Sequence, residues 1–281
     1  MQDTKDISEE NEMSFLEHLE VLRWHLVRSF IAVFIFAIVA FAFYDIIFDK
    51  IILAPKNSEF FTNRVLAKLG ELVNVPALAI NQTPFQVINI NLAGQFATHI
   101  SVSLVVGLIL GFPYLFFEFW QFVKPALYSN EKKHARGSIF YTSFLFAAGV
   151  LFGYYIITPL SVHFLGSYNV SDQVLNQINL KSYISSVTSI VLASGVIFEL
   201  PVLIFFLSKI GLVTPQFLKK YRKHSVILIL ILSAIITPPD VFSQILVCLP
   251  LMVLYEIGIG ISKRVYKKQQ LDLEENLPDK K

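Results

Sequence analysis

The sequence predicts an all-α membrane protein that crosses the bilayer six times, and two observations lead to that prediction. Hydrophobic residues make up 54% of the chain and charged residues only 16%, so most side chains must face lipid or other helices. The hydrophobic residues also gather into six segments, several with the roughly 20 helical residues needed to cross a hydrocarbon core of about 30 Å. Each crossing is expected to be helical, because backbone polar groups in lipid need internal partners. The segments run approximately over 26–44, 92–112, 138–157, 184–208, 225–236 and 241–262.

Positive charge gives the orientation. With six crossings both termini lie on the same side, and that side holds 18 of the 23 Lys and Arg residues. The positive-inside rule therefore places both termini in the cytoplasm. The first 25 residues are polar and acidic, unlike a cleavable signal peptide, so the first span is expected to remain as an anchor.

The segments outside the spans have their own patterns. Apolar residues recur at helical spacing before the first span, which predicts an amphipathic helix able to lie in the membrane interface. In the long first loop, 63–73 is amphipathic and 85–90 is expected to be extended. The loop over 159–183 is polar. We expect one membrane domain over 1–281, with an amphipathic segment at 1–25, the helix bundle at 26–262 and a cytoplasmic tail at 263–281.

The fifth span is unusually short. Only 12 uncharged residues, 225–236, precede Pro238 and Pro239, and they would cover about 18 Å as a helix. Two prolines cannot continue a helix, so the chain must turn there. Either the bilayer thins around the last two spans, or 221–224 adds another turn inside the membrane.

Three polar residues lie in or beside the last three spans. Glu199 is deep in the fourth span, where it must face protein or water or be protonated, and Pro201 should bend the helix beside it. Its carboxyl group either bonds a neighbouring helix or marks a polar site that docks a partner. Asp240 follows the two prolines and suits a helix N-cap, with Gln244 one turn later.

Enzyme and cofactor motifs are absent from the sequence. There is no His-Glu-x-x-His zinc site, no phosphate-binding glycine loop and no Gly-x-Ser-x-Gly elbow. Cys248 is the only cysteine, so no internal disulfide is possible. Basic residues flank the spans and are explained by topology, so nucleic acid is not expected as a partner. We predict neither an enzyme nor a metal or cofactor.

Four stretches of the sequence match one known family in their order and spacing. They are 18–23 (HLEVLR), 112–133 (with FPY, then FWQFVKPALY and EKK), 198–201 (FELP), and 237–258 (with TPPDVFSQ and YEIG). Through these stretches the chain resembles the TatC family, the receptor subunit of the twin-arginine protein translocase, over nearly all of its length from Phe15 to Lys263. Pro113, Phe122, Pro125, Pro201, Pro238 and Pro239 belong to these stretches.

The resemblance implies six helices in a concave bundle in the bacterial inner membrane, with no enzymatic activity. It implies a receptor that binds the twin-arginine signal peptides of folded preproteins at the cytoplasmic face. Single-span TatA/TatB-type subunits would then be recruited, export would run on the proton-motive force, and the chain would form homo-oligomers within the complex.

The implied signal-peptide site uses two carboxylates. Glu131 matches the family's acidic residue in the first cytoplasmic loop. The other acidic position, in the N-terminal motif, is Val21 here, and Glu20 lies one residue earlier. Either Glu20 takes the role of the N-terminal carboxylate, or Glu17 helps, or Glu131 acts with less support. Arg23 is the last residue of the N-terminal motif. The same acids also suit a simpler reading, in which they balance neighbouring bases on a solvated surface.

Two other functional classes fit the sequence less closely. A proton-coupled transporter of small solutes could use Glu199 for coupling, although the repeats typical of such transporters are not visible. A purely structural scaffold is the third reading.

Overall fold

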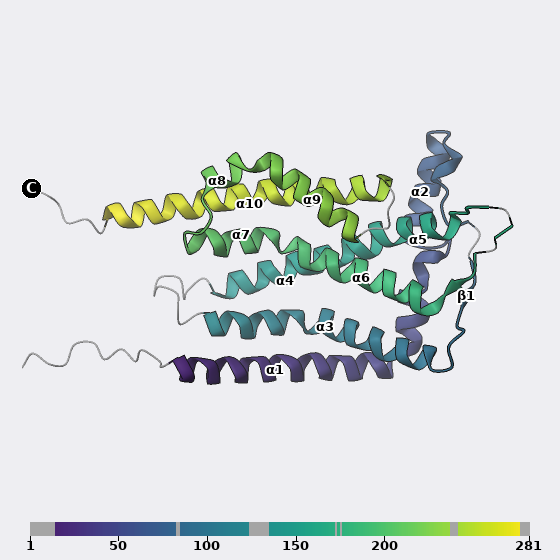
Figure 1. The fold of residues 1–281 in the computed structure, drawn as a ribbon, viewed down its shortest axis with the longest axis horizontal. Coiled ribbons are helices and arrows are strands. Elements are labelled where there is room, and N and C mark those ends of the chain that lie inside the picture. Colours follow the sequence, from purple (N-terminus) through teal and green to yellow (C-terminus); the bar gives the residue numbers. More distant parts are fainter. Residues whose placement is uncertain are drawn as a thin grey trace, which may run out of the picture.

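The computed structural model describes residues 15–82, 85–123, 135–171, 173–174, 176–236 and 241–275. Figure 1 shows a bundle of long helices that run roughly parallel or antiparallel. The long helices are α1 (Phe15–Ala42), α3 (Gly94–Val123), α4 (Ala135–Phe152), α6 (Leu180–Phe198), α7 (Leu200–Lys209), α9 (Arg222–Ile236) and α10 (Val241–Glu275).

The shorter elements connect these helices. They are the π-helical η1 (Ile46–Ile52) and η6 (Gly153–Ile157), the 3-10 turns η2 (Ala54–Lys56) and η3 (Pro76–Leu78), the helices α2 (Phe61–Leu72), α5 (Thr158–Ser167) and α8 (Pro215–Lys220), and the strands β1 (Val87–Ile88) and β2 (Ile178–Asn179). Figure 1 shows α2, α5 and β1 at one end of the bundle and the short helix α8 toward the other. The strands pair in parallel, with Val87 opposite Ile178. The extended segment expected at 85–90 is therefore confirmed in part.

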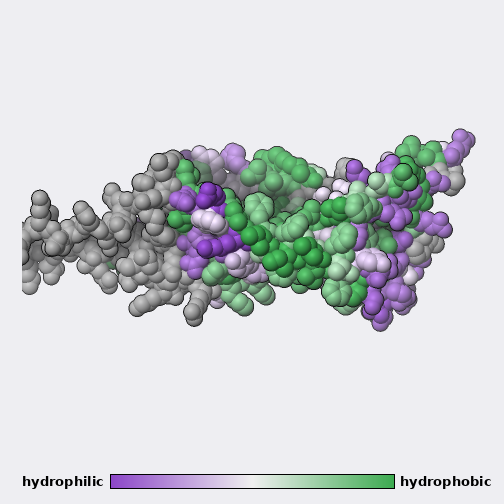
Figure 2. Space-filling view, turned by 90° about the horizontal axis from the view of Figure 1, so that it is seen from below, coloured by the Kyte–Doolittle hydropathy of each residue, from purple (hydrophilic) through white to green (hydrophobic). Residues whose placement is uncertain are grey.

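Four helical stretches within the described residues are long and apolar enough to cross a membrane: Leu19–Ala42, Gly94–Val123, Gly137–Ser167 and Leu180–Lys209. They confirm the predicted all-α membrane class. Figure 2 shows apolar side chains over the middle of one face and hydrophilic side chains toward both ends. Large apolar residues of α1 are exposed, including Phe30 at 72%, as expected of a surface in contact with lipid.

The helices extend beyond several of the predicted segments. The N-terminal amphipathic segment leads directly into the first span, because α1 continues from Phe15 to Ala42 without a break. The third span does not end near 157, since π-helical η6 leads straight into α5, whose first turn accommodates Pro159. The sixth helix continues past Ser262 to Glu275, so much of the expected tail is helical.

The helix at the position of the predicted fifth span is short, as expected. Helix α9 has 15 residues, which correspond to about 22 Å. It begins at Arg222, so part of the alternative extra turn is present, yet the helix remains well below the hydrocarbon thickness of about 30 Å.

Small residues let the long helices pack closely. A Cβ on Gly107 of α3 would lie 2.7 Å from the Val33 carbonyl oxygen in α1, and one on Gly149 of α4 would lie 2.6 Å from the Ser194 carbonyl oxygen in α6. Backbones that approach this closely gain van der Waals contact, which drives helix association in lipid. The α1–α3 and α4–α6 pairs are therefore fixed by glycine.

Two buried asparagines organise the first loop, and one of them ties it to the bundle. Asn63 is 0% exposed, and its amide donates to the carbonyls of Pro55 at 3.0 Å and Asn57 at 2.7 Å. The amide of Asn81 donates to the carbonyl of Pro159 at 3.1 Å. Both side chains satisfy backbone groups that are buried away from water.

We expect Asn63→Ala to lower the free energy of unfolding by about 1–3 kcal/mol, because it removes two hydrogen bonds made by a fully buried side chain. Thermal unfolding of the purified protein in detergent measures this loss. Asn176→Ala is the matched control, because Asn176 also bonds backbone oxygen but is exposed. Equal midpoints for the two variants would show that the network does not stabilise the fold.

Candidate functional site

The first turns of α1 carry the exposed part of the predicted site. Glu20 forms an ion pair with Arg23 at 3.6 Å, and both side chains are about two-thirds exposed. Such a surface pair stabilises a fold by roughly 0–1 kcal/mol, so a cation from a ligand can displace Arg23 at little cost. Val21, at the position of the missing carboxylate, is half-buried. The structure therefore presents Glu20 to solvent and turns Val21 toward the protein.

The other predicted residues at this end are only partly described. Glu17 belongs to α1, but its side chain is outside the described part. Glu131 and Pro125 lie outside the described residues. Phe122 packs edge-on against the ring of His25 with centroids 6.3 Å apart. Figure 1 places the end of α3 and the beginning of α4 at the same end of the bundle as the start of α1.

A buried carboxylate that sequence reasoning missed joins α1 to α3 at this end. Glu118 is 4% exposed. One of its oxygens lies 2.5 Å from Nδ1 of His25, and the other accepts a hydrogen bond of 2.7 Å from the Tyr114 hydroxyl. Arg28 is close enough to interact electrostatically with the same carboxylate. This cluster fixes the register between α1 and α3 within two helical turns of Glu20 and Arg23 along α1.

Glu118→Ala is expected to lower the free energy of unfolding by about 1–3 kcal/mol, because it removes both hydrogen bonds that the buried carboxylate makes to His25 and Tyr114. Glu118→Gln keeps an acceptor oxygen and should lower the free energy of unfolding by less. Tyr114→Phe removes a single hydrogen bond and serves as the smaller reference change. Thermal unfolding in detergent compares the three variants, and an Ala variant as stable as the wild type would exclude a structural role for the cluster.

Glu199 occupies the break between α6 and α7 in the middle of the bundle (Figure 1). Pro201 lies in the first turn of α7 and removes a backbone donor there, which explains the predicted bend. The carboxylate faces the backbone of Phe146 in α4. Neither oxygen is accessible, and within the described chain neither has a hydrogen-bond partner of ordinary geometry.

The polar end of α10 is engaged within the chain. The amide of Gln244 donates to the Leu230 carbonyl in α9 at 3.1 Å, so it holds the two helices together. Asp240, Pro238 and Pro239 lie outside the described residues. At the other end of the same helix pair, Arg222 and Glu256 form an ion pair of 2.8 Å. Pro113 lies inside α3.

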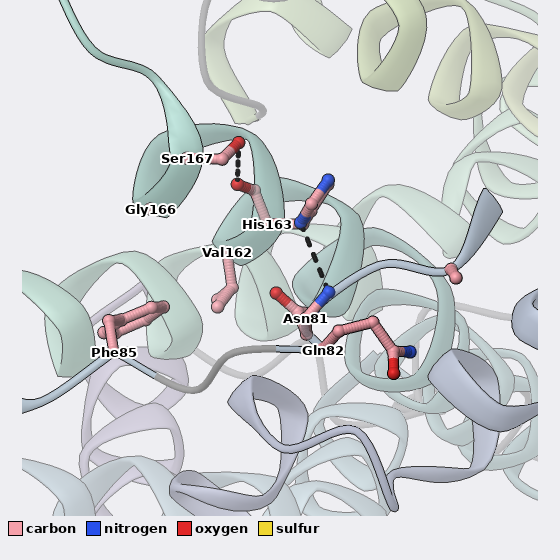
Figure 3. Close-up of a pocket in the computed structure, with 8 residues that line it drawn as sticks. Asn81, Gln82, Phe85, Val162, His163, Gly166 and Ser167 are labelled. Atoms are coloured by element: carbon pink, nitrogen blue, oxygen red, sulfur yellow. Dashed lines mark hydrogen bonds between the residues drawn. The ribbon is translucent and has the colours of Figure 1, made fainter. Parts of the chain in front are cut away.

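A cavity of about 450 Å³ lies between the segment before β1 and helix α5 (Figure 3). Its polar groups bond one another: the Asn81 N–H donates to Nδ1 of His163 at 3.3 Å, and the Ser167 hydroxyl donates to the His163 carbonyl at 2.7 Å. Ser167 therefore does not face an imidazole base, and the cavity lacks a nucleophile–base pair. Across the described ranges, His, Cys, Asp and Glu side chains do not group in threes as a metal site needs.

Comparison with known proteins gives a consistent picture. The family model described as Sec-independent protein translocase protein (TatC) matches residues 17–250. The chain is 42% identical to the Sec-independent protein translocase protein TatC of Blattabacterium sp. subsp. Periplaneta americana (strain BPLAN), over 93% of this chain and 99% of the relative. It is 32% identical to TatCy of Bacillus subtilis (strain 168), over 92% of each chain.

Solved structures agree with these sequence relatives. A crystal structure of the twin arginine translocase receptor TatC in DDM superposes with a TM-score of 0.68 at 31% identity, covering 87% of this chain and 99% of that chain. A second crystal structure of this receptor gives a TM-score of 0.63 at 32% identity and covers 89% and 99% of the two chains.

Proposed function

Because this chain belongs to the TatC family of Sec-independent protein translocase proteins, we propose that it binds the twin-arginine signal peptides of folded preproteins. Members of this family are membrane components of a protein translocase rather than enzymes. The observation that carries the proposal is the exposed and weakly paired carboxylate of Glu20. It lies at the end of the bundle where α3 and α4 are joined by the segment that carries Glu131.

Arginine chemistry explains why carboxylates suit this ligand. Two adjacent guanidinium groups are permanently charged and planar, and each matches a carboxylate in bidentate geometry. Glu20 can exchange its contact with Arg23 for a signal-peptide arginine, since both partners are solvated. Glu131 supplies the second carboxylate. Glu118 is buried and already bonded to two side chains, so its role is to position α1.

The proposal extends to topology and partners. Both termini lie in the cytoplasm, six helices cross the bacterial inner membrane, and residues 1–281 form one membrane domain. Single-span TatA/TatB-type subunits join the bound receptor, which acts as a homo-oligomer, and the proton-motive force drives export. Support comes from the distribution of Lys and Arg and from the match of the family model along the spans.

Complementation tests this function. Expression of the chain with its single-span partners in a bacterium that lacks its own TatC should restore export of a folded reporter with a twin-arginine signal peptide. A reporter with twin lysines is the control and should remain inside. Liposomes containing the purified chain should show no proton-coupled solute uptake. Uptake in liposomes without restored export would instead support a small-solute transporter.

Glu199 is proposed to dock a partner helix or the inserted signal peptide. An unpaired carboxylate at this depth is costly, and a polar group on an arriving helix would lower that cost by bonding it. Val196, one turn earlier, is 62% exposed and therefore marks the accessible face beside it. A photo-crosslinker at Val196 should capture a partner subunit or signal peptide, and Glu199→Ala should reduce both capture and export.

The control for this prediction is Leu203, which lies one turn beyond Glu199 and is 53% exposed. A crosslinker at Leu203 should give the same capture in wild type and Glu199→Ala if that change acts only locally. Capture of lipid alone at Val196, together with normal export by Glu199→Ala, would make Glu199 a packing residue.

A further inference from the structure

A second cleft, of about 310 Å³, opens where η1, the start of α2 and η6 meet. Aromatic rings form its apolar lining. Phe60 is buried and stacks on Tyr155 with centroids 5.5 Å apart, while Phe61 meets the edge of the same tyrosine at 6.1 Å. The Tyr154 hydroxyl donates to the Ile51 carbonyl at 2.9 Å, which fixes η6 against η1. The cleft is therefore a rigid aromatic recess.

Two opposite charges line the same cleft without neutralising each other. Lys50 comes from η1 and Glu59 from the residues just before α2. Both are exposed, and no ion pair of either is formed with the described residues. A ligand that carries an anionic and a cationic group would satisfy both at once.

Helix α2 extends from this cleft with an exposed apolar stripe. Phe61, Val65, Leu69 and Leu72 recur at helical spacing and are 40–79% exposed. Arg64 and Lys68 follow one edge of the stripe, one turn apart. Figure 1 shows α2 running across the direction of the long helices, at the end of the bundle opposite the start of α1. An amphipathic helix with this charge pattern and direction suits the plane of a membrane interface.

The apolar stripe of α2 begins on a helix that is a candidate membrane span, and this contact indicates that the bilayer covers the stripe. Phe61 belongs both to the stripe and to the cleft, and Thr62 donates a hydrogen bond to the carbonyl of Tyr155. Tyr155 is part of the candidate span Gly137–Ser167 and is itself 39% exposed. The stripe thus begins directly on a helix that lies in the bilayer. Aromatic residues gather at the membrane–water interface of membrane proteins, because their rings suit the headgroup region.

We propose that this cleft binds the headgroup of a zwitterionic phospholipid of the bilayer, and that the α2 stripe rests on the acyl chains beside it. Lys50 receives the phosphate and Glu59 receives the ammonium. The exposed faces of Phe61 and Tyr155 favour the ammonium further, through cation–π attraction. The bound lipid would hold η1 and α2 in the interface plane.

Lipid retention by the purified full-length chain tests the cleft. Protein extracted from bilayers with equal phosphatidylethanolamine and phosphatidylglycerol should keep more of the former. Lys50→Gln should lower retained phosphatidylethanolamine at least threefold. Glu59→Gln should lower the ratio of phosphatidylethanolamine to phosphatidylglycerol at least threefold. Lys181→Gln is the matched control, an exposed lysine that does not line the cleft. Equal retention by Lys50→Gln and Lys181→Gln would overturn the proposal.

Spin labels on α2 test the stripe independently. Cys248 is buried and does not compete for the label. Labels at Val65 and Leu69 should be accessible to oxygen and shielded from a water-soluble nickel chelate, whereas labels at Arg64 and Glu71 should be open to nickel. Nickel access at all four sites would place α2 in water. Shielding of Val65 and Leu69 from both reagents would show that protein covers the stripe. Either result contradicts a lipid-facing α2.

Discussion

Glu131→Ala and Glu20→Ala are each expected to weaken binding of a twin-arginine signal peptide by roughly tenfold or more. A hydrogen bond to a charged group contributes about 1.5–3 kcal/mol, and every 1.4 kcal/mol changes the dissociation constant about tenfold. The loss should be much smaller for a twin-lysine peptide, which cannot make bidentate contacts. Fluorescence anisotropy of a labelled peptide against the chain in nanodiscs measures both constants.

Glu71→Ala is the matched control, because Glu71 is an exposed acid of α2, at the opposite end of the bundle. High salt should narrow the difference between the two peptides, since the Glu20 site is solvated and screened. Wild-type binding by Glu20→Ala with weakened binding by Glu17→Ala would move the N-terminal carboxylate one helical turn earlier. If Glu131 alone matters, the site has a single acidic anchor.

Lengthening α9 by four leucines before Ser233 should greatly reduce export while folding and insertion are preserved. The insertion adds about 6 Å to a helix of 15 residues, which brings its length close to the hydrocarbon thickness. We propose that the short helix thins the bilayer locally and that transport depends on this thinning. Export of a folded reporter, with membrane extraction to confirm insertion, measures the effect.

The control keeps the length of α9 and changes only its apolar surface. Ile227, Ile231 and Ile235 are 51–75% exposed, and their joint replacement by leucine should leave export unchanged. The insertion also moves Ser233, which is 0% exposed, so thermal unfolding must confirm that the lengthened variant is folded. Normal export by a folded, lengthened variant would remove bilayer thinning from the mechanism.

The class of the fold follows from composition, because long apolar segments in lipid can only be helices. The ends of the helices do not follow from it. Helix α5 continues through Pro159 because the π-helical turns of η6 precede it, and proline is tolerated in a first turn. Helix α10 continues beyond Ser262, where Ser208 bonds the Ser262 hydroxyl at 2.7 Å and Gln269 bonds the Lys209 carbonyl at 2.8 Å. Such contacts join residues more than 50 positions apart, so local pattern cannot reveal them.

The sequence predicted those parts of the candidate site in which a single residue stands out from its neighbours. Glu199 stands out as an acid inside an apolar helix, and Pro201 marks the break beside it. Glu118 is likewise an acid among apolar residues, Phe116, Phe117 and Phe119, but it lies near the end of α3, where an acid is ordinarily solvated. Its partner His25 is 93 residues away. Only packing of α1 on α3 through the glycines of α3 brings the two together.

Direct peptide binding by the full-length chain tests the central claim most sharply. The chain in nanodiscs, without partner subunits, is titrated with a twin-arginine signal peptide and with its twin-lysine variant, and the double variant Glu20→Ala with Glu131→Ala is measured in parallel. A receptor that reads arginine through two carboxylates should bind the twin-arginine peptide at least tenfold more tightly, and the double variant should lose that preference. Equal affinity of the wild-type chain for both peptides would contradict the account.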